Sequence, residues 1–286
     1  MNRDAGHIRQ PAVAGYFYPL QEHALRQAIE DAFLSPLGPG ALPEINPSGP
    51  RRLLGAIVPH AGYPYSAPGA AWAFADIARD GRPAAVVLLG VNHRGFGAPL
   101  AMSHAAGWRT PLGVAPIATE IGRRLRELDP DITLDTLAHA QEHSIEVEVP
   151  FLQYLFGEAP ILPILIGHAA QEKVLALGHA LGRLAQEHDL LIMASTDFSH
   201  YVSHQVAQQQ DRLALDAIAA IQPETLLEVV QRHAITMCGV LPVAALLTAA
   251  RALDAGPASI LHYHTSGDVT GDRKEVVGYG TAVIYR

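Results

Sequence analysis

The chain has 286 residues, of which 49% are apolar, so it can bury a core as one large domain or two small ones. Its formal charge of −8 provides no broad positive field for phosphates, which argues against nucleic acid as a main partner. A single cysteine, Cys238, excludes an intramolecular disulfide and every cysteine-rich zinc site. Fifteen histidines are a high count for the commonest metal-binding residue, so their positions matter most.

The N-terminal residues and the apolar runs show no sign of a secretory signal or a membrane segment. Met1–Gln10 contains charged and polar residues where a secretory signal needs an apolar stretch. The longest apolar runs, such as Val240–Leu247, fall far short of the roughly 20 residues that span a bilayer. We therefore expect a cytoplasmic protein with no membrane segment.

Apolar periodicity predicts an α/β fold in a single domain spanning residues 1–286. Leu25, Ile29 and Phe33 mark an amphipathic helix, and the Pro/Gly-rich residues 35–52 predict a surface loop. Beyond it, short apolar runs alternate with helical stretches, as in a mainly parallel central sheet flanked by helices. The expected strands are Leu53–Val58, Ala84–Leu89, Ile161–Ile166, Leu190–Ala194 and Val276–Tyr285. The expected helices after the loop are Gly69–Arg79, Thr119–Leu128, His143–Phe156 with a kink or restart at Pro150, Gln171–Gln186, Gln205–Ile221, Pro223–His233 and Pro242–Leu253.

Three of the expected strands end in the same way, with a histidine in the turn that follows. His60, His93 and His200 each lie just past an apolar run, in a segment rich in glycine, serine or proline. Ligands of open α/β sheets bind at the carboxyl ends of the strands, so these three histidines can converge there. Any one of them alone reads better as a surface loop histidine, but three in equivalent places favour a site.

The lone cysteine lies just ahead of an expected helix. The dipole at a helix N-terminus favours a thiolate, which a metal ligand or a nucleophile must be, and Gly239 beside Cys238 allows a close backbone approach. The alternative is an inert buried cysteine.

The segment Glu142–Glu146 opens an expected helix with two carboxylates four residues apart and His143 beside them. Such groups can act as acid or base, or can orient a ligating histidine. A solvated helix start with favourable negative charge explains the segment equally well.

These segments together resemble the Memo family, whose bacterial and archaeal members are called AmmeMemoRadiSam system protein B. The similarity runs through nearly the whole chain. The motifs that carry it are Arg9-Gln-Pro-Ala-Val-Ala-Gly-Tyr-Phe-Tyr-Pro19, Gly55-Ala-Ile-Val-Pro-His-Ala-Gly-Tyr-Pro-Tyr-Ser66, Leu89-Gly-Val-Asn-His-Arg-Gly95, Glu142-His-Ser-Ile-Glu-Val-Glu-Val-Pro-Phe-Leu152, Ala194-Ser-Thr-Asp-Phe-Ser-His-Tyr201, Cys238-Gly-Val-Leu-Pro242 and Thr265-Ser-Gly-Asp-Val-Thr-Gly-Asp272.

The resemblance implies a fold similar to the class III extradiol dioxygenases and a metal held by His60, His93 and Cys238, with Asp197 and His200 in the same pocket. Two imidazoles and a thiolate form a softer set than the two histidines and one carboxylate of those enzymes. We therefore expect iron or copper, rather than zinc, in a dioxygenase-like oxidoreductase.

In this hypothesis the substrate is a small aromatic or chelating molecule. His200, oriented by Asp197, acts as general acid and base. Tyr63, Tyr65 and His143 shape the substrate pocket.

Three other functions stay open. A zinc hydrolase would activate water at the two histidines, and an amidase-like enzyme would use Cys238 as nucleophile with His200 as base. A module that binds phosphopeptides or proteins would reuse the pocket without catalysis. The family also implies a radical-SAM protein and an AMMECR-type protein as partners.

Overall fold

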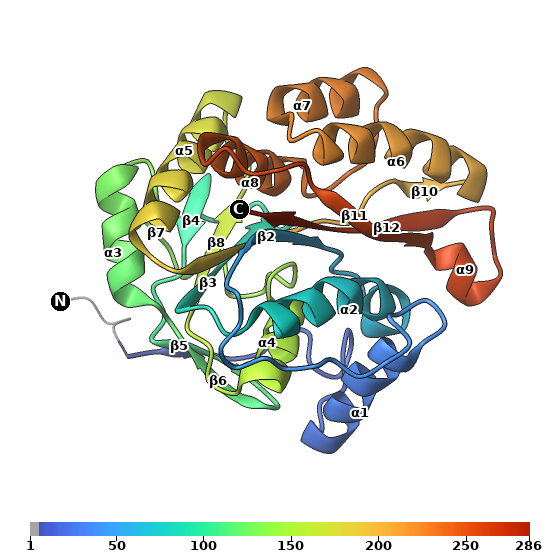
Figure 1. Cartoon of the computed structure of the whole chain (residues 1–286), viewed down its shortest axis with the longest axis horizontal. Helices are drawn as coiled ribbons and strands as arrows, with labels where there is room; N and C mark the ends of the chain where they lie inside the picture. The colour runs from blue at the N-terminus through green and yellow to red at the C-terminus, as the bar shows by residue number, and fades with distance from the viewer. Residues whose placement is uncertain (1–5) are drawn as a thin grey trace.

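In the computed structural model, which describes residues 6–286, a nine-stranded mixed sheet separates two layers of helices (Figure 1). The four central strands are parallel, and antiparallel strands flank them on both sides. This confirms the predicted α/β fold with a mainly parallel central sheet. The sheet runs in the order β10 (His200–Val202), β12 (Val276–Tyr285), β2 (Leu53–Val58), β9 (Leu190–Ser195), β3 (Ala85–Val91), β8 (Ile161–Ile166), β4 (Leu100–Met102) and β7 (Thr133–Leu134), with β11 (Ser259–Thr265) also paired to β12. A separate small sheet joins β1 (Ile8–Arg9), β5 (Gly107–Thr110) and β6 (Gly113–Pro116).

The central strands are apolar on both faces because helices cover both. In β9, Leu190, Ile192 and Ala194 pack into one core, whereas Leu191 and Met193 pack into the other. Alternate side chains of a strand point to opposite faces, so a continuous apolar run suits a strand between two helical layers.

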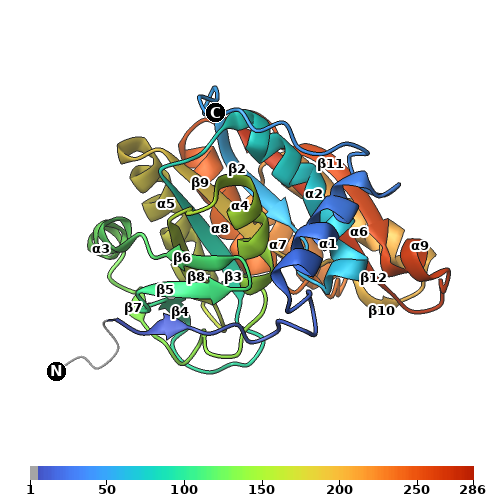
Figure 2. The same ribbon diagram turned by 90° about the horizontal axis from the view of Figure 1, so that it is seen from below.

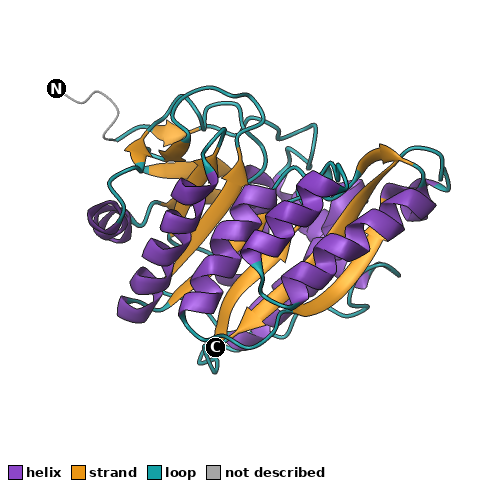
Figure 3. Ribbon diagram, turned by 90° about the horizontal axis from the view of Figure 1, so that it is seen from above, coloured by secondary structure: helices purple, strands orange, loops and turns teal. Residues whose placement is uncertain are grey.

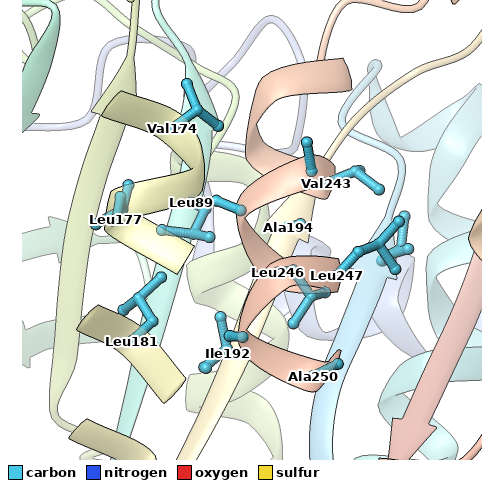
Figure 4. Packing of buried hydrophobic residues seen from close by; sticks show 14 of the residues in the cluster. Leu89, Val174, Leu177, Leu181, Ile192, Ala194, Val243, Leu246, Leu247 and Ala250 are labelled. Carbon is cyan, nitrogen blue, oxygen red and sulfur yellow. The ribbon is translucent and has the colours of Figure 1, made fainter. Parts of the chain in front are cut away.

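One layer consists of long helices that lie side by side on the sheet (Figure 3). Leucine and valine side chains of α5 and α8 meet those of β3 and β9 there (Figure 4). The two helices approach closely at Gly178, where an added Cβ would lie 2.5 Å from the Cβ of Thr248. The helices of this layer are α3 (Thr119–Leu128), α5 (Gln171–Glu187), α6 (His204–Ala219), α7 (Pro223–Arg232) and α8 (Val240–Ala252).

The opposite layer is built on α2 and can be followed in Figure 2. Its core includes Phe74 and Phe151, whose rings stack with centroids 4.5 Å apart, and Phe33 meets the latter edge-on. The elements of this layer are α1 (Glu22–Leu34), α2 (Tyr63–Asp80), the 3₁₀ helix η1 (Glu146–Glu148), α4 (Val149–Phe156) and the short α9 (Ser266–Thr270).

Two helices differ from the sequence-based expectation. The helix expected to begin at Gly69 begins at Tyr63, because Pro64 occupies the first turn, where its missing N–H is not needed. The helix expected over His143–Phe156 is a turn, then η1, and only then α4, so the chain restarts with Pro150 in the first turn of α4.

Two further expectations concern the Pro/Gly-rich loop and membrane-spanning helices. Residues 35–52 form a loop with no helix or strand, as predicted. Within residues 6–286, none of the helices combines the length and the apolar character that a bilayer crossing demands.

Candidate metal centre

Side chains from four distant segments meet at the carboxyl ends of the parallel strands. His60 follows β2, His93 follows β3, and Cys238 precedes α8. One potential ligand atom from each of these three residues lies within 4.8 Å of those of the other two. The fourth segment brings Asp197, which follows β9 between β2 and β3. The sheet order therefore brings together residues that are as much as 178 positions apart.

His60 is buried at the centre of this cluster. Its backbone N–H donates to Oδ1 of Asp197 at 2.8 Å, and its ring Nδ1 lies 2.8 Å from Oγ of Ser195. The other ring nitrogen, Nε2, lies 3.3 Å from Sγ of Cys238. Burial, followed by the neighbouring rings of His143 and His93, lowers the pKa of His60 well below its usual value, so the ring is neutral near pH 7.

His93 is held from behind by the buried carboxylate of Glu142. The carboxylate accepts from the backbone N–H of His93 at 2.7 Å and from its ring Nδ1 at 2.9 Å. Because Nδ1 carries the donated proton, Nε2 keeps its lone pair, as a ligating histidine requires. Burial alone would raise the pKa of Glu142, but the hydrogen bond from His93 and the charges of His93 and His143 lower it to about 2.

Cys238 is partly exposed and lies next to both His60 and Asp197. Its Sγ accepts from the backbone N–H of Asp197 at 3.2 Å. The sequence predicted that the helix dipole would favour the thiolate. In the metal-free protein the surroundings of Cys238 instead favour the neutral thiol. Burial and the carboxyl of Asp197 raise the pKa of Cys238. A cation at the centre would reverse this by stabilising the thiolate directly.

Asp197 and His200 lie at the same edge of the sheet, but within residues 6–286 no hydrogen bond joins their side chains. Nδ1 of His200 lies 2.7 Å from the carbonyl oxygen of Phe198 and 2.9 Å from that of Thr236. Backbone carbonyls, not Asp197, therefore orient the ring. Burial raises the pKa of Asp197 to about 6, although the N–H of His60 and the charge of His200 oppose the rise.

His143 lies beside the rings of His60 and His93. It stacks on His93 with centroids 4.7 Å apart and meets His60 edge-on at 5.5 Å. Its Nδ1 lies 3.2 Å from the carboxylate of Glu142, and burial lowers its pKa to about 4. His143, His93 and Glu142 form a second group of potential ligand atoms within 4.8 Å of one another.

The two tyrosines expected in the pocket occupy different environments. Tyr63 is only 5% exposed and belongs to the apolar core, where its hydroxyl donates to the carbonyl oxygen of Val147 at 2.8 Å. Its hydroxyl proton is therefore already used in this hydrogen bond. Tyr65 is 41% exposed, and its backbone carbonyl accepts from His264 at 2.8 Å.

The predicted pairing of Glu142 and Glu146 on one helix face is wrong. Glu142 holds His93, whereas Glu146 receives the guanidinium of Arg9, the hydroxyl of Tyr18 and two backbone N–H groups of the N-terminal segment. Arg9 also donates to the carbonyl oxygen of Glu142 at 2.6 Å. Glu146 therefore anchors the N-terminal segment next to the candidate metal centre.

Sequence reasoning missed two residues behind His60. Ser195 ends β9 and contacts Nδ1 of His60, and Glu148 in η1 has a carboxyl oxygen 3.4 Å from the serine hydroxyl. Both lie inside motifs that indicate the family, but a serine in an apolar strand and a glutamate in a short helix carry no signal of burial beside a site.

The donor set fits a transition metal. Two imidazoles and a thiol converge, one imidazole is oriented by a carboxylate, and the other is oriented by a hydroxyl. Ligating histidines need such partners on the second ring nitrogen. The residues present can therefore hold a metal ion, and their softness suits iron, copper or zinc.

Known proteins with similar sequences cover nearly the whole chain. The Memo-like protein family matches residues 9–283. A MEMO1 family protein of Methanopyrus kandleri is 44% identical over 285 residues, which are 97% of this chain and 99% of that protein. A MEMO1 family protein of Methanothermobacter thermautotrophicus is 42% identical over 274 residues, 95% of this chain and 98% of that protein.

A solved structure shares the fold. The crystal structure of an uncharacterized protein from Escherichia coli K12 superposes with a TM-score of 0.51 at 16% identity, covering 80% of this chain and 99% of that one. The full-length sequence matches settle the family. The chain belongs to the Memo-like family.

Proposed function

We propose that this protein is a metal-dependent oxidoreductase that holds iron or copper at His60, His93 and Cys238 and acts on a small, chelating aromatic substrate. The observation that carries the proposal is the convergence of two imidazoles and one thiol within 4.8 Å at the ligand-binding edge of an α/β sheet. The resemblance to class III extradiol dioxygenases favours redox chemistry over hydrolysis.

A bound iron or copper ion would supply Lewis acidity and one-electron chemistry at this point. Cys238 must lose its proton to bind, and burial raises its pKa, so metal binding releases a proton and strengthens as the pH rises. Asp197 holds the backbone of His60 on one side and donates its own N–H to the sulfur on the other. It thereby fixes two of the three ligands relative to each other.

His200 is the residue that accepts a proton from a substrate hydroxyl. Carbonyl oxygens can only accept, so the two that contact Nδ1 of His200 require a proton there. Nε2 is left with a lone pair and can act as a general base. The backbone N–H of His200 donates to Oγ1 of Thr236 at 2.6 Å, which fixes the backbone that carries the ring.

The test begins with protein purified without an affinity tag. Metal analysis should find iron or copper in the wild type and a large loss in Cys238→Ala. His23→Ala, which changes an exposed histidine on α1, should keep the metal and serves as the matched control. Wild-type protein without metal, or an unchanged metal content in Cys238→Ala, would refute the proposed centre.

Activity is tested by anaerobic reconstitution with iron or copper, followed by oxygen consumption with a panel of catechols and other chelating aromatics. We expect consumption with at least one substrate, dependent on the metal and on His200. Zinc occupancy with hydrolysis but no oxygen consumption would favour a hydrolase. Activity that survives chelators and is blocked by thiol alkylation would favour a cysteine nucleophile.

A further inference from the structure

The hydroxyl of Ser195 lies at a junction of three polar groups behind the metal centre. Its Oγ is 2.8 Å from Nδ1 of His60, 2.6 Å from the carbonyl oxygen of Ser144 and 3.4 Å from Oε1 of Glu148. Ser195 is buried, and the carboxyl of Glu148 is only 1% exposed. Water therefore does not compete for these contacts.

The proton count at this junction has one consistent solution. A hydroxyl has one proton to donate and two lone pairs that accept. The carbonyl oxygen of Ser144 can only accept and makes the shortest contact, so Ser195 donates there. Towards His60 the hydroxyl can then only accept, so His60 brings the proton, on Nδ1. The contact with Oε1 of Glu148, at 3.4 Å, is too long to fix a proton by itself, but a proton on the Glu148 carboxyl is the arrangement in which the hydroxyl can also accept there.

The surroundings of Glu148 agree with a neutral carboxylic acid. None of the ion pairs between side chains of residues 6–286 includes Glu148. Burial, followed by the neighbouring carboxyl of Asp197, raises the pKa of Glu148 well above its usual value, although the contact with Ser195 opposes the rise. An ionised carboxylate without a positive partner would be costly in such a place.

We propose that Ser195 and protonated Glu148 form a positioning pair, which holds the proton of His60 on Nδ1 and so presents the lone pair of Nε2 towards Cys238. The pair touches neither substrate nor metal and acts through His60. This inference rests on the proposed function, because the tautomer of His60 has a role only if His60 binds a metal. The tautomer itself exists in the metal-free protein and is measurable there.

The first experiment measures the ring nitrogens of His60 by ¹⁵N NMR in metal-free, full-length protein, with His60→Gln used to assign the signals. We expect a protonated Nδ1 and an unprotonated Nε2 in the wild type. Ser195→Ala should shift the ring towards the other tautomer, and Ser195→Thr, which keeps the hydroxyl, should restore it. A wild-type His60 with its proton on Nε2 would overturn the proposal even if the alanine variant failed to fold.

The second experiment examines Glu148 by infrared difference spectroscopy of the wild type against Glu148→Gln. A protonated carboxyl stretch that shifts in D₂O should be present in the wild type and absent from the variant. A carboxylate band in its place would overturn the assignment. Glu148→Gln keeps a side-chain N–H donor and should retain the His60 tautomer, whereas Glu148→Leu should weaken it.

The third experiment uses cobalt(II), whose thiolate charge-transfer band reports binding by Cys238. Ser195→Ala should lower cobalt affinity by roughly 10- to 100-fold, as other changes behind ligating histidines do, while Ser195→Thr and Glu148→Gln stay near the wild type. If the tautomer is as expected but the wild type binds no metal, the proposed function fails and the positioning pair stands. If metal binds equally well in Ser195→Ala, the pair has no role in binding and this inference fails.

Discussion

Two pairs of histidine rings in this protein have similar spacing and very different surroundings. His60 and His93 have ring centroids 5.3 Å apart at the strand ends, and His262 and His264 on β11 have centroids 5.1 Å apart. In the first pair each Nδ1 has a partner, a serine hydroxyl or a carboxylate, and the sulfur of Cys238 lies beside them.

The β11 pair lacks these features. His264 uses Nε2 to donate to the carbonyl oxygen of Tyr65, while its Nδ1 and the Nε2 of His262 are buried without a hydrogen-bond partner among residues 6–286. His262 instead stacks on Trp72 with centroids 5.7 Å apart. Proximity of two imidazoles is therefore not enough for a metal site. The pair of His60 and His93 differs because Cys238 provides a third donor and each Nδ1 has a hydrogen-bond partner that defines its proton.

The largest expected effect is on metal binding, when one histidine of each pair is replaced. His60→Ala removes a ligand and should reduce metal affinity by more than the roughly 10- to 100-fold typical of changes behind a ligand. His262→Phe should leave the metal content unchanged, because the β11 pair lacks the third donor that we expect a metal site to need. Metal analysis of both variants checks this. Equal losses in both would show that the comparison is wrong.

A smaller effect is expected from the carboxylate behind His93. Glu142→Gln weakens the charge-assisted hydrogen bond to Nδ1, so we expect metal affinity to fall by roughly 10- to 100-fold, measured by competition with a chelator. Glu158→Gln, an exposed glutamate, is the control and should bind like the wild type. Unchanged affinity in Glu142→Gln would mean that His93 needs no such partner.

The β11 pair should respond in folding stability. His262→Phe removes a buried nitrogen that has no partner and keeps an aromatic ring against Trp72. We expect the free energy of unfolding to rise by about 1 kcal/mol in denaturant titrations near neutral pH. A loss of stability of similar size would show that Nε2 of His262 has a favourable contact in solution.

The smallest effect concerns pH. Burial, followed by the charge of His264, lowers the pKa of His262 to about 4, whereas the unfolded chain has a value near 6.5. Between these values the unfolded state binds the proton and the folded state does not, so stability falls as the pH drops through this window. The side chain is partly exposed, which limits the effect to about 1 kcal/mol. His262→Phe should flatten the slope, and an unchanged slope would assign it to other groups.

Much of the framework could be predicted because the parallel strands are buried on both faces. Their continuous apolar runs locate β2, β3 and β9, and the turns that follow locate His60 and His93. The strand β11 was not predicted, because its sequence includes His262 and His264, whose burial depends on packing against α2 and not on apolar character.

The segment around Glu142 shows why the sequence pattern gave the wrong secondary structure at the site. The sequence predicted a helix over His143–Phe156. However, the Glu142 side chain accepts the backbone N–H groups of His143 and Ser144, and such local bonds compete with helix formation. The roles of Ser195 and Glu148 could not be predicted, because they depend on contacts between distant segments.

The central claim is that two imidazoles and the thiolate of Cys238 hold a metal ion, and X-ray absorption spectroscopy at the edge of the native metal tests it most directly. The wild-type spectrum should fit one sulfur and two imidazole nitrogens, and the sulfur contribution should be absent from the spectrum of the metal that Cys238→Ala still binds. A wild-type metal coordinated by nitrogen and oxygen alone, with no sulfur, would contradict the account.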